Sequence, residues 1–376
     1  MASPLDTQAP SRFLSLDVFR GLAVALMIVV NTPGPGAHPY AILIHAKWFG
    51  FTAADWVFPS FLFAVGSAMA FAFSRPTTHA AFALKVLRRA ALIFVLGFLM
   101  YWYPFVHRDG GAWSLSPFAD TRVMGVLQRI ALCYALGAFA VRYLTIRKLI
   151  ALSVLLLLGY WAILVAFDPA DPFAKLGNAG THLDLWVFGQ SHLYRKDGGF
   201  DPEGLLGTLP ATVNVIAGYL AARVLKDSPD RRRALARMAL AGLVLALAGL
   251  AWSPVFPIAK KLWTGSFVLL TVGQDLALLA ALAAVLEGRA PNPATRFFQV
   301  FGRNPLVIYL FSELFVTTLR QFQVAPDVDL YDWVGINLFQ AIAPGPFGSL
   351  LCAIAYTLVC WSLGYVLDRR NIVVRL

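Results

Sequence analysis

Charged and amide side chains lie inside a long apolar stretch near the start of the chain. Asp17 and Arg20 are three residues apart within SLDVFRGLAVALMIVVN, so a helix would place them on one face. Asn31 follows eleven residues after Arg20, which is about three helical turns and about 16 Å further along nearly the same face. A charge at membrane depth costs a few kcal/mol and is usually kept for a functional site. The stripe therefore predicts either a neutralised Asp17–Arg20 pair or an Arg20 that binds a phosphate or another anion.

A histidine loop comes directly before the second apolar run. His45 stands in IHAKWFG, three residues before Trp48 and ten before Asp55, which opens that run. An imidazole, with an unperturbed pKa of about 6.5, suits the role of a general base. Asp55 is interpreted in two ways, either as a cap for the following helix or as a carboxylate that orients the imidazole. His45 is the sharpest candidate for catalysis.

A later loop holds further polar side chains in two short motifs. HLYR (192–195) and DPEG (201–204) contain His192, Tyr194, Asp201 and Glu203. These residues are interpreted either as a binding site for a polar substrate or as a turn followed by a helix N-cap. Other polar groups fall inside apolar runs, where they usually face the bundle interior or a wet cavity; they are Gln128, Arg129, Asn214, Gln274, Asp275, Arg303, Asn304 and Glu313. Together they predict a polar passage.

The rest of the chain is built to cross a membrane. Of its 376 residues, 59% are hydrophobic and 14% are charged, whereas soluble domains carry about 25% charge. Ten apolar runs are long enough to be spans: 13–31, 55–74, 85–103, 122–143, 148–167, 205–225, 234–252, 264–286, 297–319 and 347–367. The prediction is an all-α fold, a polytopic membrane helical bundle of about ten transmembrane helices in a single domain, residues 1–376. The first run is too long for a signal-peptide core and is expected to stay as the first helix.

Basic residues predict the orientation of this bundle. The net charge is +11, and the Lys and Arg residues gather in alternate loops and at the carboxyl end, which marks these as cytoplasmic. Both termini are therefore predicted to be cytoplasmic, and nucleic-acid binding is excluded as the reason for the charge. The loops with His45 and His192 would then face outward. The three cysteines lie within apolar runs without metal-ligand spacing, so they are expected to be structural and no metal is expected.

Six motifs, in order along the chain, resemble the heparan-α-glucosaminide N-acetyltransferase family. They are SLDVFRG (15–21), HAKWFGFTAADWVFPSFLFAVG (45–66), GVLQRI (125–130), HLY (192–194), DPEGLLGT (201–208) and GRNPLVIYLFSELF (302–315). The resemblance implies a transmembrane enzyme that moves the acetyl group of cytoplasmic acetyl-CoA to a glucosamine amine on the far side. It also implies a bacterial relative, placed in the inner membrane. O-acyltransferases resembling this first helix carry a histidine where this chain has Asn31, which favours N-acylation.

The resemblance also implies roles for the residues. His45 matches the family's active-site histidine and Asn31 its asparagine of the first helix, so the predicted catalytic set is His45, Asn31 and Asp55. The polar stripe that binds CoA would fall on Arg20 and Arg129, and the predicted donor-binding set is Arg20, Asp17, Arg129 and Asn304. The predicted acceptor-binding set is Trp48, His192, Tyr194, Asp201 and Glu203. The lysosomal member has an additional N-terminal luminal segment, which could engage polymeric heparan. This chain is expected to lack that segment, so a small amino sugar is the expected acceptor here.

The leading hypothesis is a polytopic acetyl-CoA-dependent N-acetyltransferase for amino sugars. His45 would take the amine proton, and Asn31 would donate to the developing oxyanion. Direct transfer and a double displacement through acetyl-His45 both stay open. The rivals are a sugar transporter, which is disfavoured because no clear inverted repeat is visible, and an O-acyltransferase acting on a surface glycan. The expected partners are acetyl-CoA, the acceptor and the lipid bilayer, and a homodimer stays open.

Overall fold

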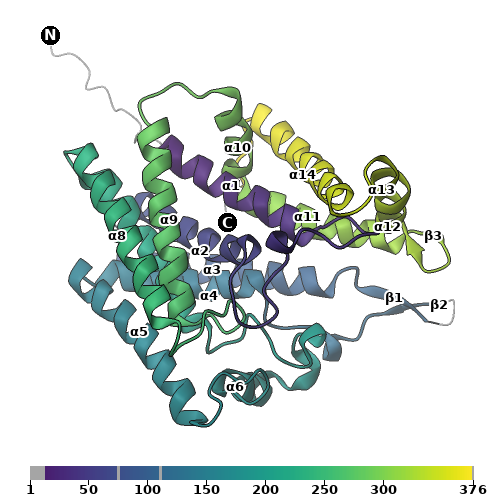
Figure 1. The fold of residues 1–376 in the computed structure, drawn as a ribbon, viewed down its shortest axis with the longest axis horizontal. Coiled ribbons are helices and arrows are strands. Elements are labelled where there is room, and N and C mark those ends of the chain that lie inside the picture. The colour runs from purple at the N-terminus through teal and green to yellow at the C-terminus, as the bar shows by residue number, and fades with distance from the viewer. Residues whose placement is uncertain (1–12, 74–76, 110–111, 375–376) are drawn as a thin grey trace.

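A computed structural model of the protein describes residues 13–73, 77–109 and 112–374, which are mostly helical (Figure 1). The long helices are α1 (Leu14–Asn31), α2 (Ala53–Ala72), α3 (His79–Trp102), α4 (Val126–Tyr143), α5 (Ile146–Phe167), α7 (Thr208–Asp227), α8 (Arg231–Trp252), α9 (Gly265–Leu286) and α14 (Pro346–Arg369). The shorter helices are α6 (Ala179–Phe188), α10 (Pro293–Arg303), α11 (Pro305–Gln321), α12 (Leu330–Val334) and α13 (Gln340–Ile342).

Two small antiparallel hairpins depart from the predicted all-α fold. Strand β1 (Val106–Asp109) pairs with β2 (Ala112–Leu115), and Val106 lies opposite Leu115. Strand β3 (Gln323–Ala325) pairs with β4 (Val328–Asp329). Both hairpins follow the carboxyl end of a helix, α3 or α11, where the chain leaves the bundle. They were not predicted because each strand is too short to show an alternating pattern in the sequence.

The helices divide into an inner and an outer group. Seven of the described helices are long and apolar enough to cross a membrane, namely α1, α2, α5, α7, α8, α9 and α14. The apolar windows of α1, α2 and α7 are 67–78% buried, whereas those of α5 and α8 are only 22% buried. The outer helices expose large apolar side chains such as Leu155 and Leu240, which is expected of a surface that faces lipid. The protein is thus a polytopic helical membrane protein.

The inner helices approach one another closely at glycines. A Cβ on Gly66 of α2 would lie 1.8 Å from the carbonyl oxygen of Val215 in α7, and one on Gly218 of α7 would lie 1.9 Å from that of Phe63 in α2. Ser67 also donates a hydrogen bond to the carbonyl of Gly218 across the interface, at 3.1 Å. Small residues that let two backbones meet are typical of helix contacts inside membranes. This contact fixes α2, and therefore the loop before it, against the core.

The ninth predicted span, 297–319, is not one helix. The structure ends α10 at Arg303 and begins α11 at Pro305, with Asn304 between them at φ −129° and ψ 52°. Proline has no N–H for the helix ladder, and it disfavours helical backbone at the residue before it. Pro305 therefore breaks the helix at this point.

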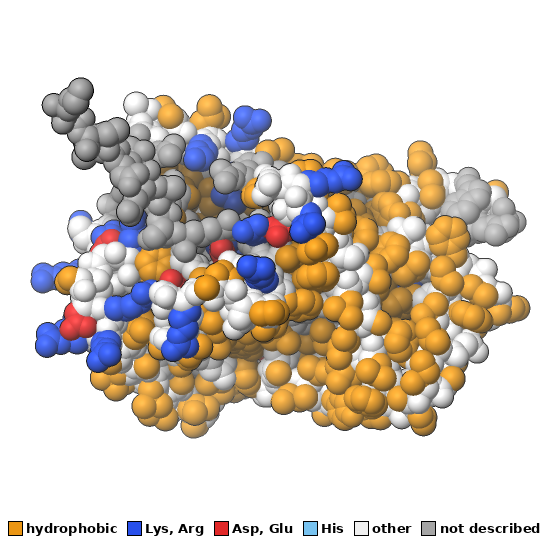
Figure 2. All heavy atoms as spheres, turned by 90° about the horizontal axis from the view of Figure 1, so that it is seen from above, with side chains coloured by type: hydrophobic (Ala, Val, Ile, Leu, Met, Phe, Trp, Pro, Cys, Tyr) orange, Lys and Arg blue, Asp and Glu red, His pale blue; other side chains and the backbone are white. Residues whose placement is uncertain are grey.

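Loops far apart in the sequence meet at one end of the bundle, which we call the histidine end. The α1–α2 loop (32–52) is joined to the α8–α9 loop (253–264) by a hydrogen bond from Gly50 N to Ile258 O, at 2.8 Å. It is joined to the α5–α6 loop by a bond from Trp48 Nε1 to Phe173 O, at 3.0 Å. Figure 2 shows another face of the molecule, where Lys and Arg side chains gather beside the residues drawn in grey and hydrophobic side chains cover much of the remainder. The side of the membrane that each end faces stays a prediction.

Candidate active site

His45 and Asp55 form a hydrogen-bonded pair at the histidine end. His45 Nδ1 lies 2.8 Å from Asp55 Oδ1. The Asp55 side chain is fully buried, whereas that of His45 is 37% exposed. Because a carboxylate only accepts, Nδ1 must carry the proton in this bond, and the lone pair of a neutral ring is then on Nε2. The pair therefore presents a proton-accepting nitrogen on a ring whose orientation is fixed.

Asp55, the third residue of α2, also takes part in capping that helix, whose N-cap is Thr52. Its Oδ2 accepts hydrogen bonds from the backbone N–H of Thr52, at 3.0 Å, and of Ala46, at 3.1 Å. The Thr52 hydroxyl donates to the same oxygen at 3.1 Å. Capping of the helix and orientation of the imidazole were weighed as alternatives. In the structure Oδ2 serves the cap and Oδ1 binds the imidazole, so Asp55 performs both tasks. The cap holds the carboxylate still, which in turn holds the imidazole.

A lysine that was not predicted stands near this pair. Lys260, in the α8–α9 loop, lies within electrostatic range of Asp55, Glu203 and His45. Burial and the positive charge of Lys260 lower the pKa of His45, and together they outweigh Asp55, which acts in the opposite direction. Burial also lowers the pKa of Lys260 itself. The sequence offered only a weak signal for it, a Lys-Lys pair in a loop expected on the same side as His45.

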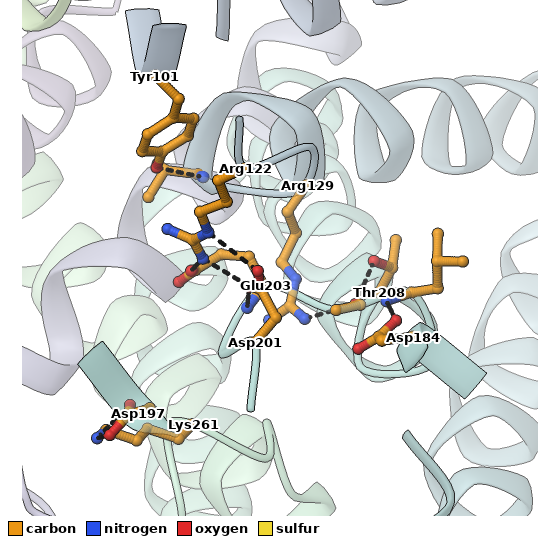
Figure 3. A network of polar contacts seen from close by, with 12 residues as sticks. Tyr101, Arg122, Arg129, Asp184, Asp197, Asp201, Glu203, Thr208 and Lys261 are labelled. Atoms are coloured by element: carbon orange, nitrogen blue, oxygen red, sulfur yellow. Dashed lines mark hydrogen bonds and ion pairs between the residues drawn. The ribbon is translucent and has the colours of Figure 1, made fainter. Parts of the chain in front are cut away.

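A second unpredicted residue, Arg122, organises two of the predicted acceptor carboxylates (Figure 3). It lies in the segment before α4, and its Nε and Nη2 donate to the two oxygens of Asp201, at 2.9 and 2.5 Å. Nη2 also donates to Glu203 Oε2 at 2.6 Å. Asp201 and Glu203 are only 3% and 5% exposed. Two buried carboxylates side by side need such a cation, because neither would stay ionised without one.

Two aromatic rings lie close to the guanidinium of Arg122. Its guanidinium carbon lies 4.5 Å from the ring centre of Tyr194 and 5.0 Å from that of Tyr101, distances typical of cation–π contacts. Burial would raise the pKa of Glu203, but Arg122, Lys260 and Arg129 together hold that pKa below its ordinary value. Glu203 is therefore ionised, and its Oε1 accepts no hydrogen bond from the part of the chain that is described.

Two other predicted acceptor residues make hydrogen bonds to the main chain. His192 Nδ1 lies 2.7 Å from the carbonyl oxygen of Thr121 and donates to it. Trp48 Nε1 donates to Phe173, as described above, and its ring meets that of Phe200 edge-on, with centroids 4.9 Å apart. These contacts join the loops of the histidine end to one another. They support a structural role for both residues, and a role in binding the acceptor stays a prediction.

Arg129, which was predicted to bind the donor with Arg20, is buried and contacts the DPEG loop. It is 1% exposed, its Nη2 donates to the carbonyl of Gly204 at 2.8 Å, and its guanidinium carbon lies 5.1 Å from the ring centre of Trp263. Its Nε and Nη1 have no hydrogen-bond partner among the described residues. The structure thus places Arg129 beside the DPEG loop, and its predicted role in binding the donor stays a prediction.

Asn31 is turned toward α11. Its Nδ2 donates to Glu313 Oε1 at 3.1 Å, and among the described residues no hydrogen bond joins it to His45 or Asp55. Tyr101 lies within electrostatic range of both Glu313 and Arg122. The structure thus pairs the Asn31 amide with a carboxylate of α11.

The predicted donor-binding residues at the other end of α1 contact neighbouring helices. Arg20 Nη1 lies 3.7 Å from Asp17 Oδ1 and donates to the carbonyl of Gly302 in α10 at 3.1 Å. A cavity of about 280 Å³ lies beside them, lined by residues that include Asp17, Glu287, Arg289 and Gln299. The structure contains the Asp17–Arg20 pair, which was one of the two interpretations of Arg20. A phosphate-binding role for Arg20 stays a prediction.

The side chain of Asn304 is hydrogen-bonded to the carboxyl-terminal segment. Its Nδ2 donates to Ile372 O at 2.9 Å, and its Oδ1 accepts from Val374 N at 2.9 Å. The side chain is 2% exposed. These bonds give Asn304 a structural role at the break between α10 and α11. Among the described residues, no group of three His, Cys, Asp or Glu side chains is arranged to hold a metal ion.

Comparisons with known proteins agree with the motifs. The model of the acyltransferase domain family matches residues 13–366. The heparan-alpha-glucosaminide N-acetyltransferase of Mus musculus is 26% identical over 363 residues, which cover 81% of this chain and 54% of that protein. The protein of that name from Homo sapiens is 27% identical over 365 residues, or 81% and 53% of the two chains. The chain spans about half the length of these relatives. The predicted resemblance is confirmed, and the chain belongs to the acyltransferase domain family.

Proposed function

We propose that the protein transfers the acetyl group of acetyl-CoA to the amine of a glucosamine-type sugar across a membrane. The observation that carries this proposal is the His45–Asp55 pair, in which Nδ1 is bound at 2.8 Å and Nε2 accepts no hydrogen bond from the described residues. Acyl transfer to an amine needs such a base, because a protonated amine cannot attack a thioester. Membership of the acyltransferase family supplies the reaction class, and the relatives' names supply the acetyl group and the amino sugar.

The chemistry follows from the free nitrogen of His45. The amine nitrogen attacks the thioester carbonyl and forms the new C–N bond, while Nε2 takes the amine proton. The tetrahedral intermediate then collapses, the C–S bond breaks, and His45 returns the proton to the departing thiolate. The products are the amide and free CoA, and His45 is regenerated. A route through acetyl-His45 uses the same nitrogen as nucleophile and stays open.

Asn31 is expected to stabilise the oxyanion of the intermediate. A primary amide has two N–H donors, and one of them is bound to Glu313 at 3.1 Å. The second is then available for an oxygen of the substrate. One such donor contributes about 3 kcal/mol to the stability of a transition state.

An acceptor screen with purified protein tests the proposal. We expect radiolabelled acetyl-CoA to label glucosamine and short glucosamine-terminated oligosaccharides, with release of CoA that depends on the amine. Glucose, which has only hydroxyl groups, serves as the matched acceptor control. Labelling of glucose at the same rate would indicate an O-acyltransferase. Sugar uptake into vesicles without release of CoA would indicate a transporter.

A labelling experiment tests the predicted orientation. Lys47 and Asp230 are exposed and lie in loops at opposite ends of the bundle, and the native cysteines are buried. Lys47→Cys in intact cells should react with an impermeant thiol reagent, whereas Asp230→Cys should react only after permeabilisation. The opposite result would exchange the donor and acceptor sides of the proposal.

A further inference from the structure

Helix α6 has two different faces. It lies between α5 and α7 in the chain and beside the carboxyl end of α5 in space (Figure 1). Asp184 is buried, whereas Trp186 is 83% exposed, more than any other large apolar side chain that the structure describes. These two residues are two positions apart, which is about 200° around a helix. Asp184 therefore marks an inner face of α6 and Trp186 an outer face.

The inner face is fixed to the DPEG loop (Figure 3). Asp184 Oδ1 accepts a hydrogen bond from Leu205 N at 2.9 Å. A Cβ on Gly204 would lie 1.8 Å from Asp184 Oδ2, so the loop approaches α6 more closely than any larger residue would allow. At the start of the helix, Asn178 Oδ1 accepts from Thr181 N at 3.0 Å and caps it. These contacts set the rotation of α6, and the outer face is held away from the bundle.

The outer face continues the lipid-facing surface of α5. That spanning helix exposes Leu155, Ile163 and Phe167, and Phe167 is its last residue. The ring of Phe167 contacts that of His182 in α6, with centroids 5.1 Å apart. His182 is itself exposed, and it lies four positions before Trp186, so the two are neighbours on one face of the helix. The exposed surface of α5 thus passes through this ring contact to Trp186.

The outer face is suited to the boundary between lipid and water. His182 and Gln190 lie four positions on either side of Trp186, and both are exposed. Such polar groups are costly in the hydrocarbon core, where they find no water to bind, whereas a large exposed apolar ring is costly in water. Tryptophan gathers at the level of the lipid headgroups because its ring is apolar and its N–H is polar. The position of α6, just beyond the end of a spanning helix, is at this level.

We propose that α6 is a membrane-surface helix whose outer face, centred on Trp186, lies in the lipid headgroup layer. Its partner is the surface of the bilayer. Because the opposite face holds Leu205 through Asp184, the loop that carries Asp201 and Glu203 is supported by a helix that rests on lipid. The inference is independent of the proposed function, because it concerns only where the chain meets the membrane.

Spin labelling of the full-length protein in lipid nanodiscs tests the depth of α6. His182→Cys places a nitroxide on the outer face and keeps Trp186, and the native cysteines are buried. Leu155→Cys on α5 is the control for hydrocarbon, and Lys196→Cys, in an exposed turn after α6, is the control for water. Power saturation in electron paramagnetic resonance compares the collisions of each label with oxygen, which concentrates in lipid, and with a neutral nickel chelate, which stays in water.

We expect the ratio of oxygen to nickel collisions in His182→Cys to lie between the ratios of the two controls. A ratio equal to that of Lys196→Cys would overturn the inference by placing α6 in water, and one equal to that of Leu155→Cys would overturn it by placing α6 in the hydrocarbon core. Few collisions with either reagent, together with spin–spin broadening that disappears on dilution with unlabelled protein, would overturn it in favour of a second copy of the chain. If His182→Cys does not fold, Trp186→Cys reports on the same face by the same ratio.

Discussion

The two ends of α1 differ in how their polar side chains are satisfied. At the amino end, Arg20 contacts Asp17 and the carbonyl of Gly302 on neighbouring α10. At the histidine end, side chains from separate loops meet, and some of their atoms accept no hydrogen bond from the described residues, including Nε2 of His45 and Oε1 of Glu203. Polar side chains that bind neighbouring helices hold those helices together, whereas open acceptors are available for a substrate. We therefore expect substitutions at the histidine end to affect chemistry and those at the other end to affect stability or donor binding.

The largest effect is expected for His45→Ala. Loss of a general base should lower the rate of acetyl transfer by about 10²–10⁴-fold, with little change in melting temperature, because the ring is partly exposed. Transfer of radiolabel to glucosamine, measured beside melting temperature, checks this. The control is His79→Ala, whose ring is exposed and bonded to Tyr143, away from the site. More than about a tenth of the original rate in His45→Ala would exclude it as the essential base.

Arg122→Met should have the next largest effect, mainly on stability. It leaves the buried carboxylates of Asp201 and Glu203 without their shared cation, and breaking a buried ion pair from one side costs about 3–5 kcal/mol. Thermal unfolding in detergent would measure the loss. Adding Asp201→Asn and Glu203→Gln removes the buried charge and should recover part of the stability. Full stability of Arg122→Met alone would show that this network does not hold the histidine end together.

The parts of this site that could be predicted are those joined by local sequence. His45 and Asp55 are ten residues apart and flank the start of a helix, so capping rules and histidine chemistry were enough to offer their pairing as one of two interpretations. Arg122 and Lys260 reach the site from loops that tertiary packing brings together, and no local sequence pattern predicts that packing. A motif assigned Arg129 to the donor site, and its hydrogen bond to the carbonyl of Gly204 also came from tertiary packing that the motif did not predict.

In the fold, too, the features with a local signal in the sequence were predicted and those without one were not. Apolar runs predicted the long helices to within a few residues, because membrane spans depend on length and composition alone. The break at Asn304 was visible in the sequence as Asn-Pro, yet the surrounding run is so apolar that it was interpreted as one span. The short hairpins β1–β2 and β3–β4 carry no such signal.

Arg20→Lys sharpens the comparison at the amino end of α1. If Arg20 binds a phosphate of CoA, loss of the bidentate guanidinium should raise the KM for acetyl-CoA by about tenfold and leave the acceptor KM unchanged. If Arg20 serves only Asp17 and Gly302, the melting temperature should fall and the donor KM should hold. Both quantities are to be measured on the same purified variant. A stable protein with an unchanged donor KM would remove Arg20 from the donor site.

The smallest effect is expected for Asn304→Ala. Both polar atoms of this buried amide are used by the backbone of Ile372 and Val374, so its removal should cost about 1 kcal/mol of stability through the lost bonds. The donor KM should stay the same, because this side chain is 2% exposed and both of its polar atoms already bind the carboxyl-terminal segment. Melting temperature and donor KM, compared with Asn337→Ala on the exposed α12–α13 segment, separate the two roles. A raised donor KM at an unchanged melting temperature would place Asn304 in the donor site, and the amino end of α1 would then be a binding site as open as the histidine end.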